Sequence, residues 1–415
     1  MTAPPPSPAP SPVPPRPLDG VRVLAAEQMQ ALPFATQLLA RFGADVVKVE
    51  PPGGESGRGS SPAIHDPEGR GVGATFLRNN LGKRSVVLDL KSDAGRALFL
   101  RLAPRFDVVA ENFKTGAMGR LGLSYDDVAA VHPGVIYLSV SGFGASDESP
   151  YAGWPAYASI AEAMSGIYAY MCPPGDTPRA NPVGAMGDIS AGLFGTVGVL
   201  AALRHRDLTG VGQHVDVAMY DAAVAMTDIV MNFASLGIPH HPFPQPFVLD
   251  SFRASDGFFV VQVVREHHFE RMAHVVGHPE WIGDPRLATR FGWGRHLEDL
   301  LRPGIETWAK DLTRLEACRA FMAEGVAAGP CHDATDLITD PHLRQRNMVV
   351  ELPRPDGEPP VLVPGNPVKM SAVPEVAERR IPWTGEHTGD VLSDELGLSD
   401  DEFAALGEAG AFGAV

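Results

Sequence analysis

Asp188 carries a carboxylate to the predicted start of a helix, because it follows Gly187 and directly precedes a long apolar stretch. Asp is favoured as a helix N-cap, and the partial positive charge of a helix N-terminus stabilises an ionised carboxylate. Gly187 is expected to leave space beside that group for an electrophilic carbonyl. The carboxylate could therefore act as a nucleophile that forms a covalent intermediate. Local sequence alone favours the simpler alternative, a helix cap without a catalytic role.

Other reactive side chains lack partners at a useful spacing. His267 and His268 are adjacent, so on a helix they would point about 100° apart, and we expect a surface or core pair. Cys172, Cys318 and Cys331 match neither a disulfide framework nor a zinc site, and we interpret them as small buried side chains. No metal site is predicted.

The turn after the first predicted strand bears on nucleotide cofactors. Residues 26–33, AEQMQALP, contain no glycine, so the backbone there is not suited to approach a pyrophosphate closely. Glu50 ends the second predicted strand, where a ribose-binding acid could lie. Without the glycine turn we expect neither NAD nor FAD, and no permanently bound cofactor. The segment 52–59, PGGESGRG, lacks the ending of a P-loop and is interpreted as a mobile loop that could close over ligand.

Composition limits the partners. The 415 residues suffice for two domains, and a net charge of −16 argues against nucleic-acid binding. No apolar run reaches the roughly 20 residues of a membrane helix. The first sixteen residues contain eight prolines and lack the pattern of a signal peptide. We expect a cytoplasmic protein with no nucleic-acid or membrane partner and a disordered Pro-rich tail at 1–16.

The elements that must position Asp188 predict an α/β fold with a Rossmann-like open parallel sheet over residues 17–235. Strands and helices alternate, as in parallel βαβ units. The predicted strands are 21–25, 45–50, 85–90, 107–111 and 135–140, and the helices between them are 35–42, 93–102 and 125–131. The helix that starts at Asp188 has small residues at 191, 192, 195 and 198, which should let it pack closely against a neighbour.

A second, smaller α/β domain is predicted at 247–335, after a Pro-rich linker at 239–246. A strand at 257–263 and helices at 266–276 and 305–325 would form it. The remaining part, 340–415, contains further strands from residue 348 and a helix near 399–406.

Segments between about residues 17 and 407 together resemble class III CoA-transferases, the family of formyl-CoA and carnitine CoA-transferases. They are 18–24 (LDGVRVL), 37–50 (QLLARFGADVVKVE), 82–91 (GKRSVVLDLK), 111–113 (ENF) with 120–122 (RLG), 187–192 (GDISAG) and 385–388 (GEHT) with 396–397 (LG). Six such motifs in order are far more specific than one. The resemblance implies a large CoA-binding domain formed by both chain ends, a smaller inserted domain, and an interlocked homodimer.

The activity implied is transfer of CoA from an acyl-CoA to a free carboxylic acid. In the family, the Asp matched by Asp188 attacks the thioester and forms an aspartyl anhydride and then an aspartyl-CoA thioester. Gln30 matches a residue near the thioester, whose amide could polarise a carbonyl or anhydride oxygen. A solvated loop glutamine is the alternative for Gln30. The acyl-CoA is a substrate in this chemistry and not a resident cofactor.

Nine residues match positions near the CoA in the family: Met29, Gln30, Ala31, Arg84, Leu88, Lys91, Asn112, Phe113 and Arg120. The fork of Arg120 suits a phosphate, and Phe113 suits the face of an adenine. Lys83, beside Arg84, is a further basic candidate. Each charged residue could instead be an ordinary surface charge.

The sequence also departs from the family pattern. Pro51 and Pro52 follow Glu50 where an Arg is frequent two residues on, and Glu162 replaces a usual glutamine. The glycine-rich substrate loop of formyl-CoA transferases is matched by a stretch with prolines at 242, 244 and 246, which argues against formyl-CoA and oxalate as substrates.

An α-methylacyl-CoA racemase is the alternative function, since these isomerases share the fold and keep the Asp. They add a histidine in the stretch matched here by residues 156–158, AYA. Racemisation needs two bases, and Tyr157 is a poor base at neutral pH. The missing histidine favours the transferase.

Overall fold

The structure, a computed structural model, describes residues 14–413 except 67, 147, 174, 182–183, 239–244 and 355. Most of the tail predicted at 1–16 and of the linker predicted at 239–246 therefore lies outside the described residues. Contacts divide the chain into two compact units. The first is Met1–Cys172, Asp176–Asn232 and Arg346–Val415, and the second is Pro173–Gly175 and Phe233–Gln345.

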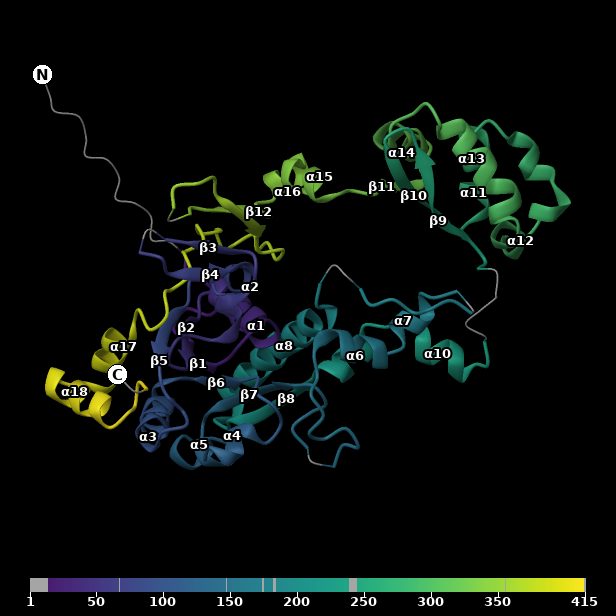
Figure 1. Ribbon diagram of the computed structural model, residues 1–415. Helices are drawn as coiled ribbons and strands as arrows, with labels where there is room; N and C mark the ends of the chain where they lie inside the picture. The colour runs from purple at the N-terminus through teal and green to yellow at the C-terminus, as the bar shows by residue number, and fades with distance from the viewer. Residues whose placement is uncertain are drawn as a thin grey trace, which may run out of the picture. The chain divides into compact units, whose positions relative to one another are not determined.

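A six-stranded sheet lies at the centre of the first unit, in the order β5-β2-β1-β6-β7-β8 (Figure 1). All its pairings are parallel, which confirms the predicted α/β fold with a Rossmann-like sheet. The strands are β1 (Arg22–Ala26), β2 (Asp45–Glu50), β5 (Arg84–Val87), β6 (Val108–Glu111), β7 (Ile136–Ser141) and β8 (Gln213–Ala218). Valine is the most frequent residue of these strands, because β-branched side chains suit a pleated, buried surface.

Helices cover both faces of the sheet. Along β1, Val23 and Ala25 belong to one core and Leu24 and Ala26 to the other, as the alternation of a strand requires. The first core is closed by α1 (Ala31–Arg41), α6 (Ala158–Met164), α8 (Met186–Thr209) and α9 (Met219–Ala225). The second is closed by α3 (Asp93–Leu102), α5 (Tyr125–Val131) and α17 (Thr388–Leu396).

Glycines let α8 approach its neighbours closely, as predicted. A Cβ at Gly192 would lie 2.7 Å from the carbonyl oxygen of Ala31, and one at Gly198 would lie 2.6 Å from Val215. By length and composition alone α8 could cross a membrane, but half of its most apolar window is buried in the protein, as in a core helix.

The last part of the chain docks on the first unit beside β5. The N–H of His387 donates to the carbonyl of Ser85 at 2.9 Å, and the hydroxyl oxygen of Thr388 accepts from the N–H of Val87 at 3.1 Å. The helices α17 and α18 (Asp400–Glu408) follow. Both ends of the described chain thus belong to the domain that contains the parallel sheet.

Short elements connect β2 to β5 and complete this unit. They are the 3-10 helix Ser56–Gly59, β3 (Ala63–His65), β4 (Gly71–Gly73) and α2 (Ala74–Asn79), with β12 (Val349–Leu352) and β13 (Val361–Pro364) nearby in a common core. The interpretation of 52–59 as a mobile loop is wrong for its second half. Arg58 is buried there and binds Glu50 through two hydrogen bonds of 2.6 Å.

The second unit is built on a three-stranded antiparallel sheet, β11-β10-β9. Its strands are β9 (Val248–Ala254), β10 (Gly257–Val263) and β11 (Ala327–Pro330), and its helices include α11 (Glu266–Val275), α13 (Arg302–Ala309) and α14 (Arg314–Ala323). The single helix predicted at 305–325 is wrong. Thr313 and Glu316 form a capping box, which starts a new helix there. Of the cysteines, Cys318 is buried as expected, whereas Cys331 is exposed.

Candidate active site

The strand order creates a switch point between β1 and β6. The chain proceeds from β1 to β2 on one side and reaches β6, β7 and β8 on the other. In open parallel sheets, ligands bind at the carboxyl ends of the strands at such a point. Asn112, just after β6, spans it: its Oδ1 accepts from the N–H of Gln28, and its Nδ2 donates to the carbonyl of Gln28, both at 2.9 Å. The side chain of Asn112 thus holds the loop after β1 by binding the backbone of that loop.

That loop also contains Met29, Gln30 and Ala31. Met29 adopts a left-handed backbone with φ of 62°, and its N–H donates to Glu55 at 3.2 Å. Gln30 is half-buried and is the N-cap of α1, and its side chain makes no capping hydrogen bond. The amide of Gln30 is therefore not used by the helix that it begins.

A buried ionic cluster lies beneath the loop. The ammonium of Lys83 contacts Glu27 at 2.6 Å and the Asn80 side chain at 3.0 Å, and Lys48 lies 3.5 Å from both Glu27 and Glu55. Burial opposes ionisation of Glu27, but the two ammonium groups outweigh it and lower the pKa of Glu27. Burial lowers the pKa of Lys83 to about 8 despite Glu27. Lys83 is enclosed in this cluster, so its interpretation as a phosphate contact is wrong.

Asp188 lies in the first turn of α8 and is half-buried. The helix begins at Met186, with Ala185 as its N-cap, so the prediction that Asp188 is the N-cap is wrong. Gly192, one turn further on the same face, contacts the backbone of Ala31. The starts of α1 and α8 are therefore neighbours, and Asp188 lies on the side of α8 that faces the loop of Gln30.

Gly187 has a different role from the one expected. A Cβ there would lie 2.9 Å from the carbonyl oxygen of Ala158, so the glycine lets α8 start against α6. The space beside Gly187 is filled by this backbone and is not open to a thioester. The N–H of Gly187 donates at 3.0 Å to Glu162, which is buried on α6.

The electrostatics around Asp188 favour its neutral form more than water does. Burial and the nearby carboxylate of Glu162 raise the pKa of Asp188 to about 6. At pH 7 the group is still mostly ionised, and it is more basic than an ordinary aspartate. Such a carboxylate can act as a nucleophile near neutral pH.

The other predicted CoA-binding residues lie after β5 and β6. Leu88 is buried in the core and Lys91 is exposed, both just after β5. Phe113 is half-buried, and its N–H donates to Glu111 at 2.9 Å. Arg120 is exposed at the end of the short helix α4 (Ala117–Arg120).

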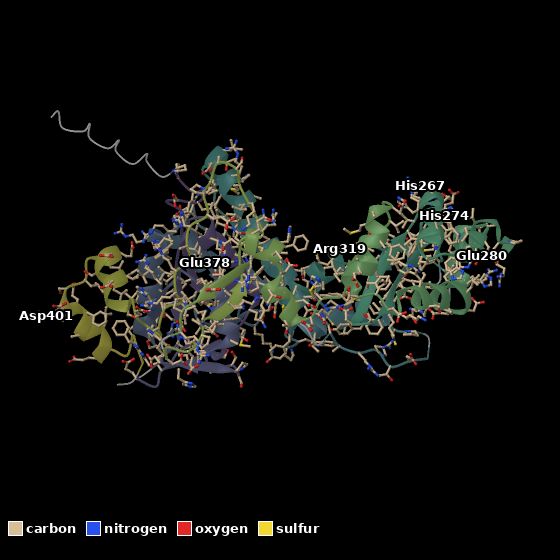
Figure 2. The ribbon with its side chains drawn as sticks, turned by 90° about the horizontal axis from the view of Figure 1, so that it is seen from above. His267, His274, Glu280, Arg319, Glu378 and Asp401 are labelled. Carbon is tan, nitrogen blue, oxygen red and sulfur yellow. The ribbon has the colours of Figure 1, made fainter. Side chains whose placement is uncertain are left out.

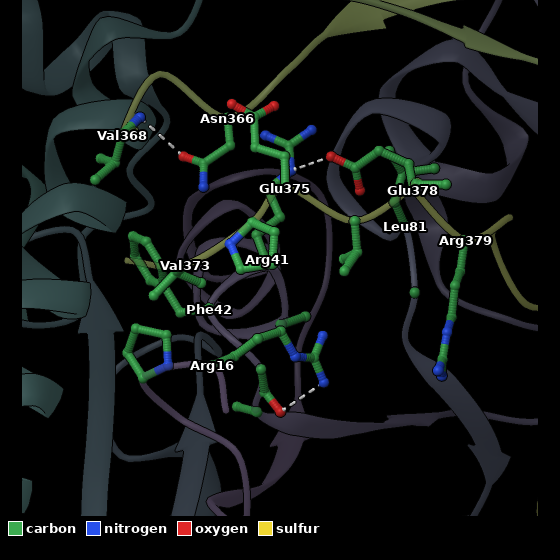
Figure 3. Close-up of a pocket in the computed structure, with 18 of the residues that line it drawn as sticks. Arg16, Arg41, Phe42, Leu81, Asn366, Val368, Val373, Glu375, Glu378 and Arg379 are labelled. Atoms are coloured by element: carbon green, nitrogen blue, oxygen red, sulfur yellow. Dashed lines mark hydrogen bonds and ion pairs between the residues drawn. The ribbon is translucent and has the colours of Figure 1, made fainter. Parts of the chain in front are cut away.

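Arg84 does not join this group. It is the first residue of β5 and pairs with Asp45, the first residue of β2, so it lies at the amino-terminal edge of the sheet. A cavity of about 420 Å³ near that edge is lined by Arg16, Arg41 and Glu378 among others (Figure 3). Arg41 and Glu378 form an ion pair of 2.8 Å there. The cavity is therefore at the opposite edge of the sheet from Asp188.

The paired histidines lie on α11 in the second unit. His267 is exposed (Figure 2). Its ring centroid is 4.2 Å from that of His268. Within the described part of the chain, no group of three His, Cys, Asp or Glu side chains is arranged to hold a metal ion.

Sequence reasoning assigned no role to Glu162, Glu27 or Lys48. A signal for the last was present: Lys48 interrupts the apolar run of β2, and a charge in a central strand requires a buried partner. Glu162 was visible only as an acid in place of an amide. Its contact with Gly187 spans 25 positions of sequence.

Comparison with known proteins shows the family to which the chain belongs. The model of "CoA-transferase family III" matches residues 18–388. The chain belongs to this family. It is 34% identical over 389 residues to a succinyl-CoA:mesaconate CoA-transferase of Haloarcula hispanica, covering 92% of this chain and 96% of the relative. It is 36% identical over 408 residues to a succinyl-CoA–D-citramalate CoA-transferase of Chloroflexus aurantiacus, covering 94% and 97%.

A solved CAIB/BAIF family protein from Brucella suis has the same fold, with a TM-score of 0.79 and 31% identity over 91% of this chain and 99% of that one. As a family III CoA-transferase, the protein is an enzyme that transfers CoA between an acyl-CoA and a carboxylate, and CoA thioesters are its substrates. This confirms the family and the enzyme class that the motifs predict.

Proposed function

We propose that Asp188 is the nucleophile of a covalent transfer. An ionised oxygen of Asp188 adds to the thioester carbonyl, the C–S bond breaks, and a mixed anhydride and CoA thiolate result. The thiolate then adds to the Asp188 carbonyl and expels the donor acid as its carboxylate. The acceptor acid reverses these steps, which restores the Asp188 carboxylate. Two covalent intermediates replace one difficult displacement.

The single observation that supports this assignment is the placement of Asp188. It is a half-buried carboxylate in the first turn of a long helix, beside the start of α1. The N-terminus of α8 opposes the effects of burial and of Glu162, which favour the neutral form. The neighbouring Gln30 has an uncommitted amide that can donate to the oxygen of the tetrahedral intermediate.

Replacement of the nucleophile tests the proposal. Asp188→Asn keeps the size of the side chain but not the attacking oxygen, and we expect transfer to fall by several orders of magnitude while thermal unfolding is unchanged. Asp188→Glu should cost roughly 10²-fold because one methylene displaces the attacking oxygen.

Trapping identifies the intermediate directly. The wild type is mixed with succinyl-CoA alone and then with hydroxylamine, which should leave a hydroxamate on the peptide that contains Asp188. Near-normal transfer by Asp188→Asn, or a hydroxamate on another peptide, would exclude this residue as the nucleophile.

For CoA we propose a path along the carboxyl ends of β1, β5 and β6. Met29, Gln30 and Ala31 would contact the thioester end, Phe113 the adenine, and Lys91 and Arg120 the phosphates. Both cations are exposed, Lys91 just after β5 and Arg120 at the end of α4, so they can approach a phosphate without desolvation of a buried charge. Leu88 and Asn112 would support this path from the core and through Gln28.

The acid substrates are proposed to be small dicarboxylates. Relatives that are one-third identical over nearly the whole chain use succinyl-CoA with mesaconate or D-citramalate, according to their names. A panel of acyl-CoAs incubated with succinate, methyl-branched and hydroxylated dicarboxylates, and read by mass, would identify the pair. The racemase alternative gains no support, because exposed Tyr157 caps α6 where a second base would be needed.

We further propose that two copies associate as an interlocked homodimer. The helix α8 presents an exposed apolar stripe, with Leu193 43%, Phe194 40% and Val197 62% exposed. Apolar patches of this kind mark interaction surfaces. The family provides the interlocked arrangement as an expectation.

A further inference from the structure

Glu162 is a carboxylate whose two oxygens are both occupied. It lies on α6 and is only 3% exposed. Its Oε1 accepts from the N–H of Gly187 at 3.0 Å, and its Oε2 accepts from the hydroxyl of Tyr168 on α7 (Ile167–Tyr170). Gly187 directly precedes Asp188, so Glu162 is tied to the turn that carries the proposed nucleophile.

A charge is not needed for these two hydrogen bonds. A glutamine of the same shape could accept from Gly187 with its carbonyl oxygen and donate to the Tyr168 oxygen with its amide. Burial of a carboxylate is far more costly than burial of an amide. The hydrogen bonds alone therefore do not explain why this position carries a negative charge.

No cation of the surrounding helices neutralises that charge. The first turn of α8 is packed against α6, α9 and the start of α1, and α6 is packed against α7. In α6, α7, α9 and residues 31–40 of α1, all of which the structure describes, there is no lysine, arginine or histidine. The titratable groups of these stretches are Glu162, Tyr168, Tyr170, Tyr220 and Asp221. The segment before α8, whose Asn181 contacts Tyr168, adds Asp176 and Arg179, and both are exposed.

We propose that Glu162 is a positioning residue that anchors the first turn of α8 and places a second negative charge beside the carboxylate of Asp188. This inference rests on the proposed role of Asp188 as the nucleophile. The added charge makes that carboxylate more basic, and a more basic oxygen attacks a thioester faster once it is ionised. The cost is activity in acid, where Asp188 is protonated.

The direction of the electrostatic effect agrees with this geometry. Burial first, and Glu162 second, raise the pKa of Asp188 to about 6. The ionised nucleophile is therefore lost as the pH falls through 6. Removal of the neighbouring charge should move that loss to lower pH, because only the burial contribution remains.

The test is Glu162→Gln, with kcat/KM for succinyl-CoA measured from pH 4.5 to 8.5. We expect the acid limb of the wild type to have a midpoint near pH 6. The variant's midpoint should lie lower by about one unit, as expected for loss of a nearby like charge. Its rate at pH 8 should be lower by roughly two- to fivefold because the nucleophile is less basic. Thermal unfolding checks that the variant is folded.

Tyr168→Phe is the matched control, because it removes one hydrogen bond to Glu162 and keeps the charge. Its acid limb should stay at or above the wild-type midpoint. Glu162→Ala removes the anchor and the charge together, so its rate should fall at every pH. Coincident acid limbs in Glu162→Gln and the wild type would overturn the proposal, even if Asp188→Asn is inactive. Activity of Asp188→Asn would instead overturn the proposed nucleophile.

A measurement on the wild type covers the case in which Glu162→Gln does not fold. Aspartate carboxyl carbons are labelled with ¹³C and titrated, and the signal of Asp188 is identified by its absence in Asp188→Asn. A midpoint near pH 6 supports the raised basicity. An ordinary aspartate midpoint, near pH 4, would overturn it.

Discussion

Arg120, proposed to bind a CoA phosphate, differs from the proposed nucleophile in being a solvent-exposed charge. Its guanidinium is exposed at the end of α4, after the strand that forms one side of the switch point. A planar fork of this kind binds two phosphate oxygens at once, and in solvent it needs no compensating partner. If the two proposed roles hold, recognition of CoA and activation of its thioester belong to different residues and can be tested separately.

Arg120→Ala should accordingly weaken binding of the acyl-CoA and leave the chemical step intact. We expect its KM to rise roughly ten- to hundredfold with little change in kcat, as for loss of one charge-assisted contact. Steady-state kinetics with varied acyl-CoA measure both parameters. Arg101→Ala, an exposed arginine in the last turn of α3, is the control and should behave as the wild type. An equal effect of both changes would place the CoA site elsewhere.

The limits of sequence reasoning at this scale are clear from Asp188. The residue and the helix could be identified, but the capping role could not be assigned correctly. The helix begins two residues earlier, at Met186. The backbone N–H of Gly187, in its first turn, donates to the side chain of Glu162, which lies 25 positions away in sequence. Local patterns describe caps formed by neighbours in sequence, and a cap supplied by another helix leaves no local signal.

The loop after β1 depends on the ionic cluster beneath it. Lys48 contacts the carbonyl of Glu27 at 3.3 Å, and Glu55 accepts from the N–H of Met29. The charges of this cluster therefore fix the backbone that presents Gln30. Buried ion pairs contribute little net stability when intact, but an unpaired buried charge is strongly unfavourable.

Lys83→Met tests this dependence. It should lower the free energy of unfolding by about 3–5 kcal/mol, because Glu27 loses its closest cationic partner in a buried site. Denaturant unfolding followed by tryptophan fluorescence measures the change. Lys310→Met, an exposed lysine of the second unit, should change stability by less than about 0.5 kcal/mol. A similarly small effect of Lys83→Met would show that the cluster does not support the fold.

The elements of the first unit were predictable because their strands are short, rich in β-branched residues and regularly followed by helices. The strands of the second unit were harder to predict from the sequence. The strand β9 lies directly after residues with a proline-rich composition, and its partner β11 reads AAGP, which has no strand character. Both strands form by pairing with β10. Pairing with a strong neighbour, and not their own propensity, stabilises them.

For the whole molecule, the exposed stripe of α8 is the feature that a single chain leaves unexplained. Half of the most apolar window of this 24-residue helix is buried in the chain, and the exposed apolar residues beside it could contact a partner surface. A second copy is the partner we propose. An apolar stripe of this kind also suits a lipid surface, and flotation with vesicles separates the two partners.

Val197→Glu should disrupt such a dimer, because it places a charge where apolar atoms would be buried. Size-exclusion chromatography with light scattering should give twice the 44.2 kDa chain mass for the wild type and a shift toward one chain for the variant. Ile282→Glu, at an exposed apolar residue of the second unit, should remain like the wild type. A monomeric wild type that floats with anionic vesicles would refute the dimer.

The docking of residues 385–388 on β5 has a consequence for synthesis on the ribosome. His387 and Ser85 are 302 positions apart, yet they share two hydrogen bonds at the edge of the parallel sheet. The edge strand that emerges early must therefore wait for nearly the entire chain before its last partner is available. The second unit, whose contacts are local to residues 233–345, can become compact in that interval. By topology, the parallel-sheet domain begins first along the chain, and its last partner is synthesised only after the whole inserted domain.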